Sequence, residues 1–555
     1  MAKRRPRLRV IPLGGLEEVG KNMTVLQYGD DMVVIDAGLM FPDEDLPGVD
    51  LVLPDYSYVL DNAKKLRGIV ITHGHEDHTG ALPYLLADLG RRVPVLGTKL
   101  TLGLVGARLE EHDLDRPRLR EIHPGRPERL GCFEFDFVPV NHSIPDGVAL
   151  IIGTPVGRVV HTGDFKLDHT PIDGRRTDFA ALAAAGSDGV LLLMSDSTNA
   201  ENPGVTRPEA EVGKTLRQIF RQAQGRIIVA SFASHIHRIQ QVCDAAVESG
   251  RTIVVTGRSM IKNFRIASEL GYLRVDESRV RDAYDIKDLP AEDVVILCTG
   301  SQGEPLSALA RIANGEHKTV KVQQGDTVVI SATPVPGNEK AVSRVINRLF
   351  KAGAQVHHKS VSDVHVSGHA AAEELKFMLS VVRPRYFMPI HGETRHLHAH
   401  ALLAQAVGVP DERVFVLENG SPLELTSRTA RVGKPVESGV MYVDGLSVGD
   451  VHTGVLRDRK RLARDGIVTI VVAIDAHDGS AVSEPEVVMR GVAFRPDPEL
   501  LDAAKERVAK VLARTAREKA TDHVVVTKAL RDSFSQFMWD QTRSRPMVIP
   551  IVMEV

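Results

Sequence analysis

The stretch THGHEDHTG holds the residues of this 555-residue sequence whose types and spacing are best suited to metal chemistry. Within it stand three histidines and one aspartate: His73, His75, Asp77 and His78. In a loop that leads from a strand to a helix, alternate residues His73 and His75 can face one metal ion while Asp77 and His78 face a second. Imidazole and carboxylate ligands without thiolate suit Zn²⁺ or Mn²⁺. The motif therefore indicates a dinuclear metal site rather than the alternative, a histidine-rich solvated turn.

A dinuclear site needs further ligands from distant parts of the chain. His142 follows FDFVPVN, Asp164 follows VVHTG, and His391 follows YFMPI. Each of the three stands after an apolar, strand-like run and beside Gly or Asn, where strand ends present functional groups. Taken singly, each is also compatible with a hydrogen-bonded turn residue. Their common position makes these residues the expected additional ligands.

Length and composition describe a globular protein of several domains. At 555 residues the chain exceeds one usual core, and about three or four structural units are expected. Apolar residues make up 43% and charged residues 25%, which excludes a disordered or coiled-coil chain. The sequence has no apolar run of about 18 residues, and its start MAKRRPRLRV lacks the apolar region of a signal peptide. We therefore expect a cytoplasmic protein with no membrane association.

Cysteine usage and net charge narrow the chemistry further. Cys132, Cys243 and Cys298 stand far apart without CxxC spacing, so neither a disulfide framework nor a cysteine-bound zinc is expected. The formal net charge of −3 excludes a uniformly basic coat, so nucleic-acid binding would need a local basic lining. The basic clusters at Lys3–Arg9 and Arg457–Arg464 are more typical of a solvated terminus and linker than of a phosphate track.

Two styles of strand alternate along the chain and predict its organisation. From residue 8, short apolar runs end in Gly, Asp or Asn, which predicts a β-rich α/β unit: LRVIPLGG, MTVLQYG, MVVIDAG, LRGIVITHGH, RVVHTGDF and VLLLMSDST. After Asn202, helical stretches at Arg207–Ala223 and His235–Ser249 alternate with buried, parallel-type strands, which predicts a second, doubly wound unit: RIIVAS, TIVVTG, DVVILCTG and TVVISAT. The first style returns around Ser362–Glu393, as expected if the second unit is inserted into a loop of the first.

The order THGHEDHTG, NHS, HTGDF resembles motifs two to four of the metallo-β-lactamase superfamily, with Asp36 in VVIDAG as the first motif. The resemblance implies an αββα sandwich with its site at one edge of the two sheets. It also implies how the ligands divide between two divalent ions: His73, His75 and His142 on one ion, Asp77, His78 and His391 on the other, and Asp164 bridging both. Asp36 would orient the ligand loop, which is also what a turn aspartate before Gly does.

The inserted unit resembles the β-CASP domain of nucleases. Asp196 in LLLMSDST matches the first β-CASP motif, His369 in VHVSGHA matches the second, and His391 matches the third. The third position is a histidine in the RNA-acting members and typically a valine in the DNA-acting ones. The resemblance therefore favours RNA as the substrate.

Within that group the sequence resembles the bacterial ribonuclease J family along nearly all of residues 10–450, in stretches such as GGLEEVGKNM, FPDEDLPGVD, SDSTNAENPG, SFASHIHRIQ, TGSQGEP and SATPVPGNE. Together with the strand patterns, it implies an α/β protein with a metallo-β-lactamase αββα sandwich in two parts, residues 1–205 and 363–450. A doubly wound β-CASP domain, residues 206–362, would be inserted between them. Residues 451–555 would form a linker and a small α+β C-terminal domain, with a helical pattern at Leu500–Ala520.

The same resemblance implies a bacterial nuclease that degrades and processes RNA, in mRNA decay and rRNA processing. It would act as a 5′-to-3′ exoribonuclease that prefers 5′-monophosphate ends of single-stranded RNA, with additional endonuclease activity. The implied partners are a second copy or more, as a homodimer or homotetramer, and an RNA-degradation complex. An extra cation at Asp50 and Asp444 is a further family-based expectation.

Phosphodiester hydrolysis needs a nucleophile, neutralisation of charge at phosphorus and a proton for the leaving 3′-oxygen. Two metal ions meet the first two needs, with Asp77 or Asp164 orienting the attacking water. His369 is the predicted general acid, held by Asp196 as a carboxylate holds an imidazole.

The family resemblance implies that two segments bind the 5′-terminal phosphate and the adjoining backbone. SFASHIHR stands at the start of a predicted helix, where free N–H groups attract anions, and offers Ser231, Ala233, Ser234 and His235. VHVSGHA offers His365, Val366, Ser367, Gly368 and His369. Ser234 is also compatible with a helix cap, which does not oppose that role.

Three other functions stay open on the sequence alone. A hydrolase of small esters, lactones or thioesters is disfavoured by the inserted unit and by the Asp196 and His369 pair. A scaffold that has lost its chemistry predicts gaps among the ligands, and none is missing. DNA repair cleavage is disfavoured by His391.

Overall fold

The computed structural model describes residues 6–42, 46–114, 118–304, 306–335, 338–445, 447–449, 453–492, 498–518 and 522–555. The chain forms two compact units, the first from Met1–Phe41 and Leu51–Met441, the second from Pro42–Asp50 and Tyr442–Val555. None of the helices in the described ranges combines the length and apolar character needed to span a membrane.

Two mixed β-sheets pack face to face in the first unit. One has the strand order β23-β22-β1-β3-β4-β6-β7-β8 and the other β20-β13-β12-β11-β10-β9. The strands of the first are β1 (Leu8–Gly14), β3 (Met23–Tyr28), β4 (Asp31–Ile35), β6 (Leu66–Val70), β7 (Val95–Gly97), β8 (Leu119–Glu121), β22 (Leu423–Leu425) and β23 (Ala430–Val432). Those of the second are β9 (Glu128–Leu130), β10 (Phe133–Pro139), β11 (Val148–Thr154), β12 (Gly157–His161), β13 (Val190–Asp196) and β20 (Tyr386–Ile390).

Successive side chains along the strands of the second sheet point to opposite faces of that sheet, and both faces are covered. Leu192 and Met194 of β13 point into the core between the sheets, together with Val33 of β4, whereas Leu193 points to the opposite face. There Leu193 meets three helices, α5 (Phe179–Asp188), α11 (Ala372–Val382) and α12 (Thr394–Ala406).

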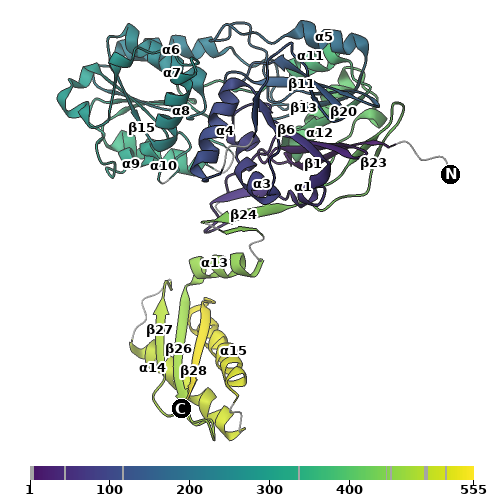
Figure 1. The fold of residues 1–555 in the computed structure, drawn as a ribbon. Helices are drawn as coiled ribbons and strands as arrows, with labels where there is room; N and C mark the ends of the chain where they lie inside the picture. The colour runs from purple at the N-terminus through teal and green to yellow at the C-terminus, as the bar shows by residue number, and fades with distance from the viewer. Residues whose placement is uncertain are drawn as a thin grey trace, which may run out of the picture. The chain divides into compact units, whose positions relative to one another are not determined.

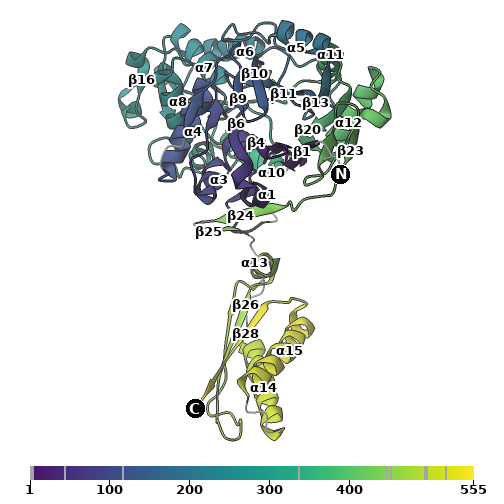
Figure 2. The ribbon, with the colours of Figure 1, turned by 45° about the vertical axis from the view of Figure 1, so that its right-hand side comes forward.

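Helices cover the far side of the first sheet as well. The main ones are α1 (Ser57–Asp61), α3 (Leu82–Leu89) and α4 (Lys99–Glu111). In both ribbon views, α5 and α11 lie on one side of the two sheets and α1 and α3 lie on the other (Figures 1 and 2). The predicted αββα sandwich is therefore confirmed.

A third sheet lies wholly within the inserted part of the chain and is parallel throughout, in the order β16-β15-β17-β14-β18-β19. Its strands are β14 (Ile227–Ala230), β15 (Thr252–Thr256), β16 (Val280–Arg281), β17 (Val294–Cys298), β18 (Thr327–Ile330) and β19 (Gln355–His358). Most of these strands are apolar runs because helices bury both faces of the sheet.

The helices of this inserted domain divide between the two faces of its sheet. On one side pack α6 (Glu209–Gln222), α7 (Ile236–Glu248) and α8 (Arg258–Glu269), and on the other α9 (Ala308–Ala313) and α10 (Glu339–Lys351). The predicted doubly wound domain is confirmed, with α6 and α7 each beginning and ending within two residues of the predicted helices. Figure 1 shows it in teal, joined to the sandwich where α4 lies beside α8.

The second unit contains a three-stranded sheet with the order β27-β26-β28. Its strands are β26 (Ile467–Ile474), β27 (Glu486–Arg490) and β28 (Met547–Glu554), and its helices are α13 (Thr453–Asp465), α14 (Pro498–Arg517) and α15 (His523–Thr542). One face of the sheet packs against α14 and α15, which confirms a small α+β domain. The predicted helix at Leu500–Ala520 corresponds to α14, and residues 519–520 lie outside the described part.

The two residues expected to bind an extra cation, Asp50 and Asp444, belong to the second unit, as does one of the two basic clusters. Asp444 forms an ion pair with Arg459 of α13, and the Oδ2 atom of Asp50 accepts a 2.8 Å hydrogen bond from the N–H of Gly445. Both carboxylates thus have partners in the protein itself, and the extra cation stays a prediction. The basic cluster at Arg457–Arg464 lies on α13, whereas residues 3–5 of the N-terminal cluster lie outside the described part.

Candidate metal centre

The predicted ligands follow the carboxyl ends of strands that meet at one edge of the sandwich. Strands β12, β13 and β20 are parallel neighbours, so the residues at their ends come together: Asp164, Asp196 and His391. Across the sandwich, β4 and β6 are also parallel, and they lead to Asp36 and to the histidine loop. That loop enters the short helix α2 (Glu76–Thr79), in which Asp77 and His78 lie.

His73, His75 and His142 form the first cluster. The Nε2 atoms of His73 and His142 each lie 3.1 Å from Nδ1 of His75. Burial lowers the pKa of all three rings, that of His75 to about 4, so they are neutral near pH 7. Neutral imidazoles whose nitrogens converge on one point are suited to hold a metal ion.

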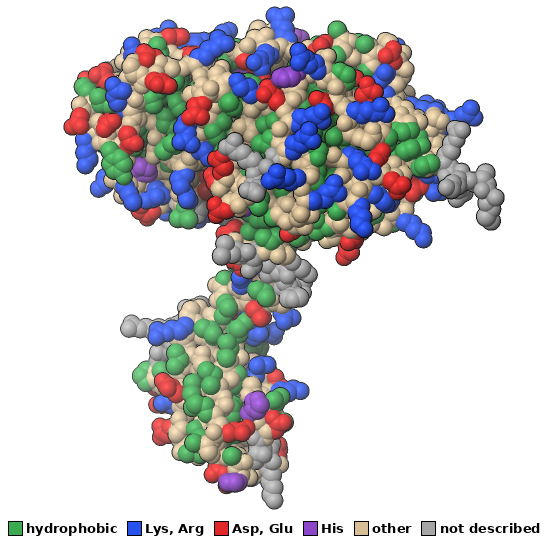
Figure 3. All heavy atoms as spheres, viewed as in Figure 1, with side chains coloured by type: hydrophobic (Ala, Val, Ile, Leu, Met, Phe, Trp, Pro, Cys, Tyr) green, Lys and Arg blue, Asp and Glu red, His purple; other side chains and the backbone are tan. Residues whose placement is uncertain are grey.

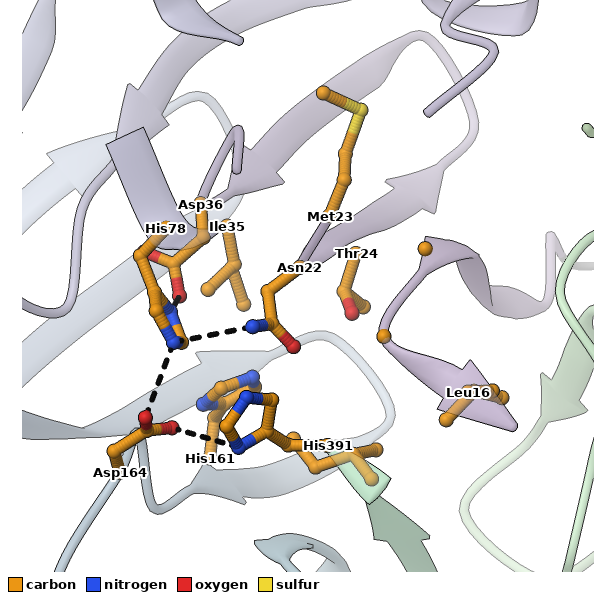
Figure 4. Close-up of a pocket in the computed structure, with 13 residues that line it drawn as sticks. Leu16, Asn22, Met23, Thr24, Ile35, Asp36, His78, His161, Asp164 and His391 are labelled. Atoms are coloured by element: carbon orange, nitrogen blue, oxygen red, sulfur yellow. Dashed lines mark hydrogen bonds and ion pairs between the residues drawn. The ribbon is translucent and has the colours of Figure 1, made fainter. Parts of the chain in front are cut away.

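Asp77, His78, Asp164 and His391 form the second cluster, part of which Figure 4 shows. The Oδ2 atom of Asp77 lies 3.3 Å from Nε2 of His391, and Oδ1 of Asp164 lies 3.3 Å from its Nδ1. Burial acts to lower the pKa of His391, but the nearby carboxylates outweigh burial and raise that pKa to about 10. The carboxylates therefore attract positive charge at this point, which a divalent cation would supply.

Asp164 lies between the two clusters. Its Oδ2 atom is 3.2 Å from Nε2 of His78 in the second cluster. In the first cluster the same atom is 3.7 Å from Nε2 of His73 and 3.9 Å from Nε2 of His142. One carboxylate thus reaches ligand atoms of both clusters.

Asp36 orients the histidine loop. Its Oδ1 atom accepts a 2.8 Å hydrogen bond from the N–H of Thr72, and its Oδ2 atom lies 2.8 Å from Nδ1 of His78. A proton held on Nδ1 leaves Nε2 of His78 free to bind a metal. On the other side of the ring, Nδ2 of Asn22 lies 3.1 Å from that Nε2 atom, as Figure 4 shows.

His369 and Asp196 form a close pair beside the second cluster. The Nδ1 atom of His369 lies 2.8 Å from Oδ2 of Asp196, and Oδ1 of Asp196 accepts hydrogen bonds from the hydroxyl and N–H of Thr198 at 2.8 and 3.0 Å. Burial acts to lower the pKa of His369, but the charge of Asp196 raises it above its ordinary value. A protonated His369 near neutral pH can donate a proton.

The donor set fits divalent cations. Three groups of ligand atoms each lie within 4.8 Å of one another: His73, His75 and His142; Asp77, His78, Asp164 and His391; and Asp164, Asp196, His369 and His391. The Nε2 atom of His391 is buried, and its contact with Oδ2 of Asp77 at 3.3 Å lacks hydrogen-bond geometry, as expected of two atoms suited to share a metal ion. The second and third groups share Asp164 and His391, so the pair of His369 and Asp196 adjoins the predicted ligands directly.

Comparisons with protein-family models cover most of the chain. Residues 31–185 match the beta-lactamase superfamily domain, and residues 224–349 match the ribonuclease J beta-CASP domain. Residues 353–417 match the Zn-dependent metallo-hydrolase RNA specificity domain, and residues 454–555 match the ribonuclease J C-terminal domain. Each matched segment coincides with a part of the sandwich, the inserted domain or the second unit.

Whole-chain relatives agree with these matches. The chain is 44% identical to ribonuclease J of Thermus thermophilus, over 99% of this chain and 95% of that protein. It is 43% identical to ribonuclease J of Mycolicibacterium smegmatis, over 99% and 97%, and 40% identical to ribonuclease J2 of Bacillus subtilis, over 99% of both chains. The chain belongs to the ribonuclease J family. The family resemblance and the fold expected from it are both confirmed.

A solved structure shares the fold of this ribonuclease J family member at low sequence identity. It is a protein of unknown function from Enterococcus faecalis, with a TM-score of 0.53 and 16% identity, covering 76% of this chain and all of that one. At that identity the likeness concerns the fold alone.

The segments predicted to bind phosphate lie at the start of α7 and before α11. Three of their polar atoms are buried with no hydrogen-bond partner in the described structure, Ser231 Oγ, His235 Nε2 and His365 Nδ1. The residue that caps α7 is His235, whose Nδ1 atom accepts from the N–H of Arg238 at 3.2 Å, so the alternative of a cap at Ser234 is wrong. A histidine fills the capping position because its ring nitrogen replaces the usual side-chain oxygen.

The other residues of these two segments differ in which polar groups they leave available for binding. Ala233 and Val366 pack into the apolar core under α6, α7 and α8, so their backbone is the part left for binding. The Oγ atom of Ser367 accepts hydrogen bonds from Asn199 Nδ2 at 2.7 Å and from the N–H of His369 at 3.1 Å, and keeps its own proton to donate. Gly368 lies against His142.

Three supporting residues were not predicted from the sequence: Asn22, Thr72 and Thr198. Each stands within a stretch that carries the family resemblance, GGLEEVGKNM, THGHEDHTG or SDSTNAENPG. Their roles depend on contacts with residues far along the chain. Their place in these stretches was the one signal that pointed to them.

Proposed function

We propose that the chain hydrolyses the phosphodiester bonds of single-stranded RNA with two divalent ions, Zn or Mn, one in each cluster. The observation that carries this proposal is the position of Asp164, whose carboxylate reaches ligand atoms of both clusters. A shared carboxylate is what a dinuclear hydrolytic site requires. Membership in the ribonuclease J family supports RNA as the substrate.

Bound ions in such a site polarise the phosphate and lower the pKa of an attacking water. Asp77 or Asp164 accepts a hydrogen bond from that water and orients it. His369 protonates the leaving 3′-oxygen, since Asp196 holds its Nδ1 atom and leaves Nε2 to donate. These roles account for the pair of His369 and Asp196 lying beside the metal ligands without joining the first cluster.

We further propose 5′-to-3′ exonuclease action on RNA that begins with a monophosphate. Ser231, His235 and His365 support it, because each keeps a buried polar atom free for a ligand. The start of α7 adds the positive end of a helix dipole, which attracts an anion. A 5′-triphosphate would exceed a pocket built for one phosphate, whereas endonuclease cutting would need the strand to pass through without ending there.

Charged side chains would contribute to RNA binding only locally under this proposal. On the face shown in Figure 3, Lys and Arg side chains are interspersed with Asp and Glu side chains and form no continuous basic coat. That distribution agrees with the net charge of −3. Affinity for RNA should therefore come from the metal centre and the phosphate pocket.

Assembly and cellular setting are proposed as well. The sheet of the second unit leaves Ile549, Ile551 and Met553 of β28 exposed, which supports self-association as a homodimer or homotetramer. Participation in an RNA-degradation complex, in mRNA decay and in rRNA processing, and a cytoplasmic location, rest on the family alone.

The proposal is tested by incubating the purified protein with Mn²⁺ or Zn²⁺ and a panel of substrates. These are 5′-monophosphorylated, 5′-triphosphorylated and circular RNA, single-stranded DNA and a small thioester. The expected order is fastest cleavage of monophosphorylated RNA, slower cleavage of the other RNAs, and none of DNA or thioester. Cleavage that persists in His75→Ala or Asp164→Ala, or no RNA cleavage with either metal, would overturn it.

A further inference from the structure

Lys166 carries a buried ammonium group with no hydrogen-bond acceptor among the described residues. Its side chain is 2% exposed. The nearest carboxylate oxygens are Oδ2 of Asp168 at 3.5 Å and Oε2 of Glu209 at 4.0 Å. A buried charge without hydrogen bonds is costly, so an ammonium group that has only these two long ion pairs is suited to bind a further acceptor.

Both neighbouring carboxylates accept hydrogen bonds from groups other than Lys166. The two oxygens of Asp168 accept from the N–H groups of Thr170 and Glu209, each at 2.9 Å. The Oε1 atom of Glu209 accepts from the guanidinium group of Arg238 at 2.7 and 2.9 Å. The ammonium group is therefore free to hydrogen-bond to a further acceptor.

The position of Lys166 places its charge beside the proposed phosphate pocket. The Oε1 atom of Glu209 is 3.8 Å from Nε2 of His235, while its Oε2 atom is 4.0 Å from Nζ of Lys166. Lys166 and His235 thus flank the same carboxylate. In agreement, the charge of Lys166 is among those that lower the pKa of His235 and of His365, after burial and Arg238.

The backbone of Lys166 belongs to the metal centre. Asp164, the carboxylate between the two clusters, stands two residues earlier on the same loop after β12. The N–H of Lys166 donates a 2.8 Å hydrogen bond to the carbonyl oxygen of Asn141, which immediately precedes His142. A phosphate bound by Lys166 would therefore be held at a fixed distance from the metal ligands.

We propose that Lys166 completes the phosphate pocket from the metallo-β-lactamase side, its ammonium group binding the 5′-terminal monophosphate of the RNA. The pocket is then shared by both domains, and Ser231, His235 and His365 supply its other polar atoms. Lys166 selects for a charged 5′ end and sets the spacing between that end and the bond that is cut. This inference rests on the proposed preference for 5′-monophosphate ends.

The experiment compares Lys166→Met, Lys166→Arg and wild-type protein on RNAs that differ only in carrying a 5′-monophosphate or a 5′-hydroxyl. A hydrogen bond to a charged group predicts that Lys166→Met lowers the ratio of the two kcat/KM values by about 10- to 100-fold. The ratio should recover in part with Lys166→Arg, since the charge is kept. Bound metal should be unchanged in both variants.

A matched control removes a lysine that bridges the two domains away from the pocket. Nζ of Lys262 on α8 lies 2.8 Å from Oε1 of Glu111 on α4. Lys262→Met should leave the monophosphate-to-hydroxyl ratio unchanged. A drop as large as that in Lys166→Met would show a general effect of loosening the domains and contradict the proposal.

A second measurement keeps the inference testable if Lys166→Met does not fold. In crystals of wild-type protein soaked with uridine 5′-monophosphate, a phosphate oxygen should lie within hydrogen-bond distance of Nζ of Lys166. A phosphate bound in the pocket beyond that distance overturns the inference. If wild-type protein shows no preference for monophosphate ends, the proposed function fails; if the preference is present and Lys166→Met retains it, only the role of Lys166 fails.

Discussion

The Nδ1 atom of His142 lies 2.7 Å from the carbonyl oxygen of Gly368, a residue 226 positions later in the chain. In the neutral ring Nδ1–H donates to that oxygen and leaves Nε2 to face the first cluster. Gly368 directly precedes His369. One hydrogen bond therefore fixes a proposed metal ligand and, through the adjoining residue, the proposed proton donor.

Gly368→Ala should displace His142. An added Cβ atom would lie 2.7 Å from Cε1 of His142 and 3.1 Å from Cβ of Ser143, so the ring must move. We expect loss of metal from the first cluster and of RNA cleavage. Metal analysis and single-turnover cleavage measure both.

The control is Gly106→Ala within α4, where the new Cβ atom would lie 3.8 Å from Cδ1 of Leu119, an ordinary contact. An alanine inside a helix should keep or raise stability, by up to about 1 kcal/mol, with full activity. Gly368→Ala protein with wild-type metal content and rate would disprove the role assigned to this close approach.

His369→Ala should slow the chemical step by about 10²- to 10⁴-fold while both metals stay bound. Asp196→Asn should have a similar effect because it removes the charge that holds the ring, at 2.8 Å, and keeps it protonated. The double variant should be little slower than either single one, as for residues that act as a unit. If the His369→Ala variant loses its metal ions, His369 has a structural role and is not the proton donor.

Asp36→Asn should weaken metal binding by about 10- to 100-fold, since the carboxylate orients His78 through its Nδ1 atom at 2.8 Å. Competition with a chelator measures the affinity. Asp88→Asn is the control, because Asp88 accepts a 2.7 Å hydrogen bond from Tyr56 outside the ligand clusters. Equal affinities in wild type and Asp36→Asn would argue against the orienting role.

His400 should make folding sensitive to acid. Burial lowers the pKa of this ring from 6.5 to about 3, and its Nδ1 atom lies 3.0 Å from Oγ of Ser197. Between those pH values His400 is protonated in the unfolded chain and neutral in the folded chain. Its contribution to the free energy of unfolding is therefore full above pH 6.5 and falls, by about 1.4 kcal/mol per pH unit, as the pH drops towards 3.

Urea unfolding at a series of pH values checks this slope. His400→Asn should lose stability less steeply than wild type between pH 6.5 and 4, because the titrating group is gone. Parallel slopes in the two proteins would mean that His400 takes up its proton as readily in the folded state as in the unfolded one.

Local sequence patterns predicted which residues would come together at one edge of the sandwich. Asp164 and His391 each follow an apolar strand, and parallel neighbouring strands bring their ends together. The convergence of these proposed ligands could therefore be anticipated from their positions at strand ends. The inserted domain was predictable for the same reason, because its strands are apolar runs with helices between them.

Contacts between distant segments were beyond prediction. Nothing local to Lys166 indicates that Glu209 and His235 will lie beside it, because that depends on how the inserted domain packs on the sandwich. The hydrogen bond from His142 to Gly368 has the same origin. The alternative of a helix cap at Ser234 was wrong because the ring of His235 takes the position usually held by a hydroxyl.

The most direct test of a two-metal site is the number of ions per chain at which RNA cleavage appears. Protein stripped of metal is titrated with Mn²⁺ while bound ions and cleavage of 5′-monophosphorylated RNA are measured together. We predict that binding reaches two ions per chain and that cleavage rises with the second. Full cleavage with one bound ion, or none with two, would contradict a centre in which Asp164 serves an ion in each of the two clusters.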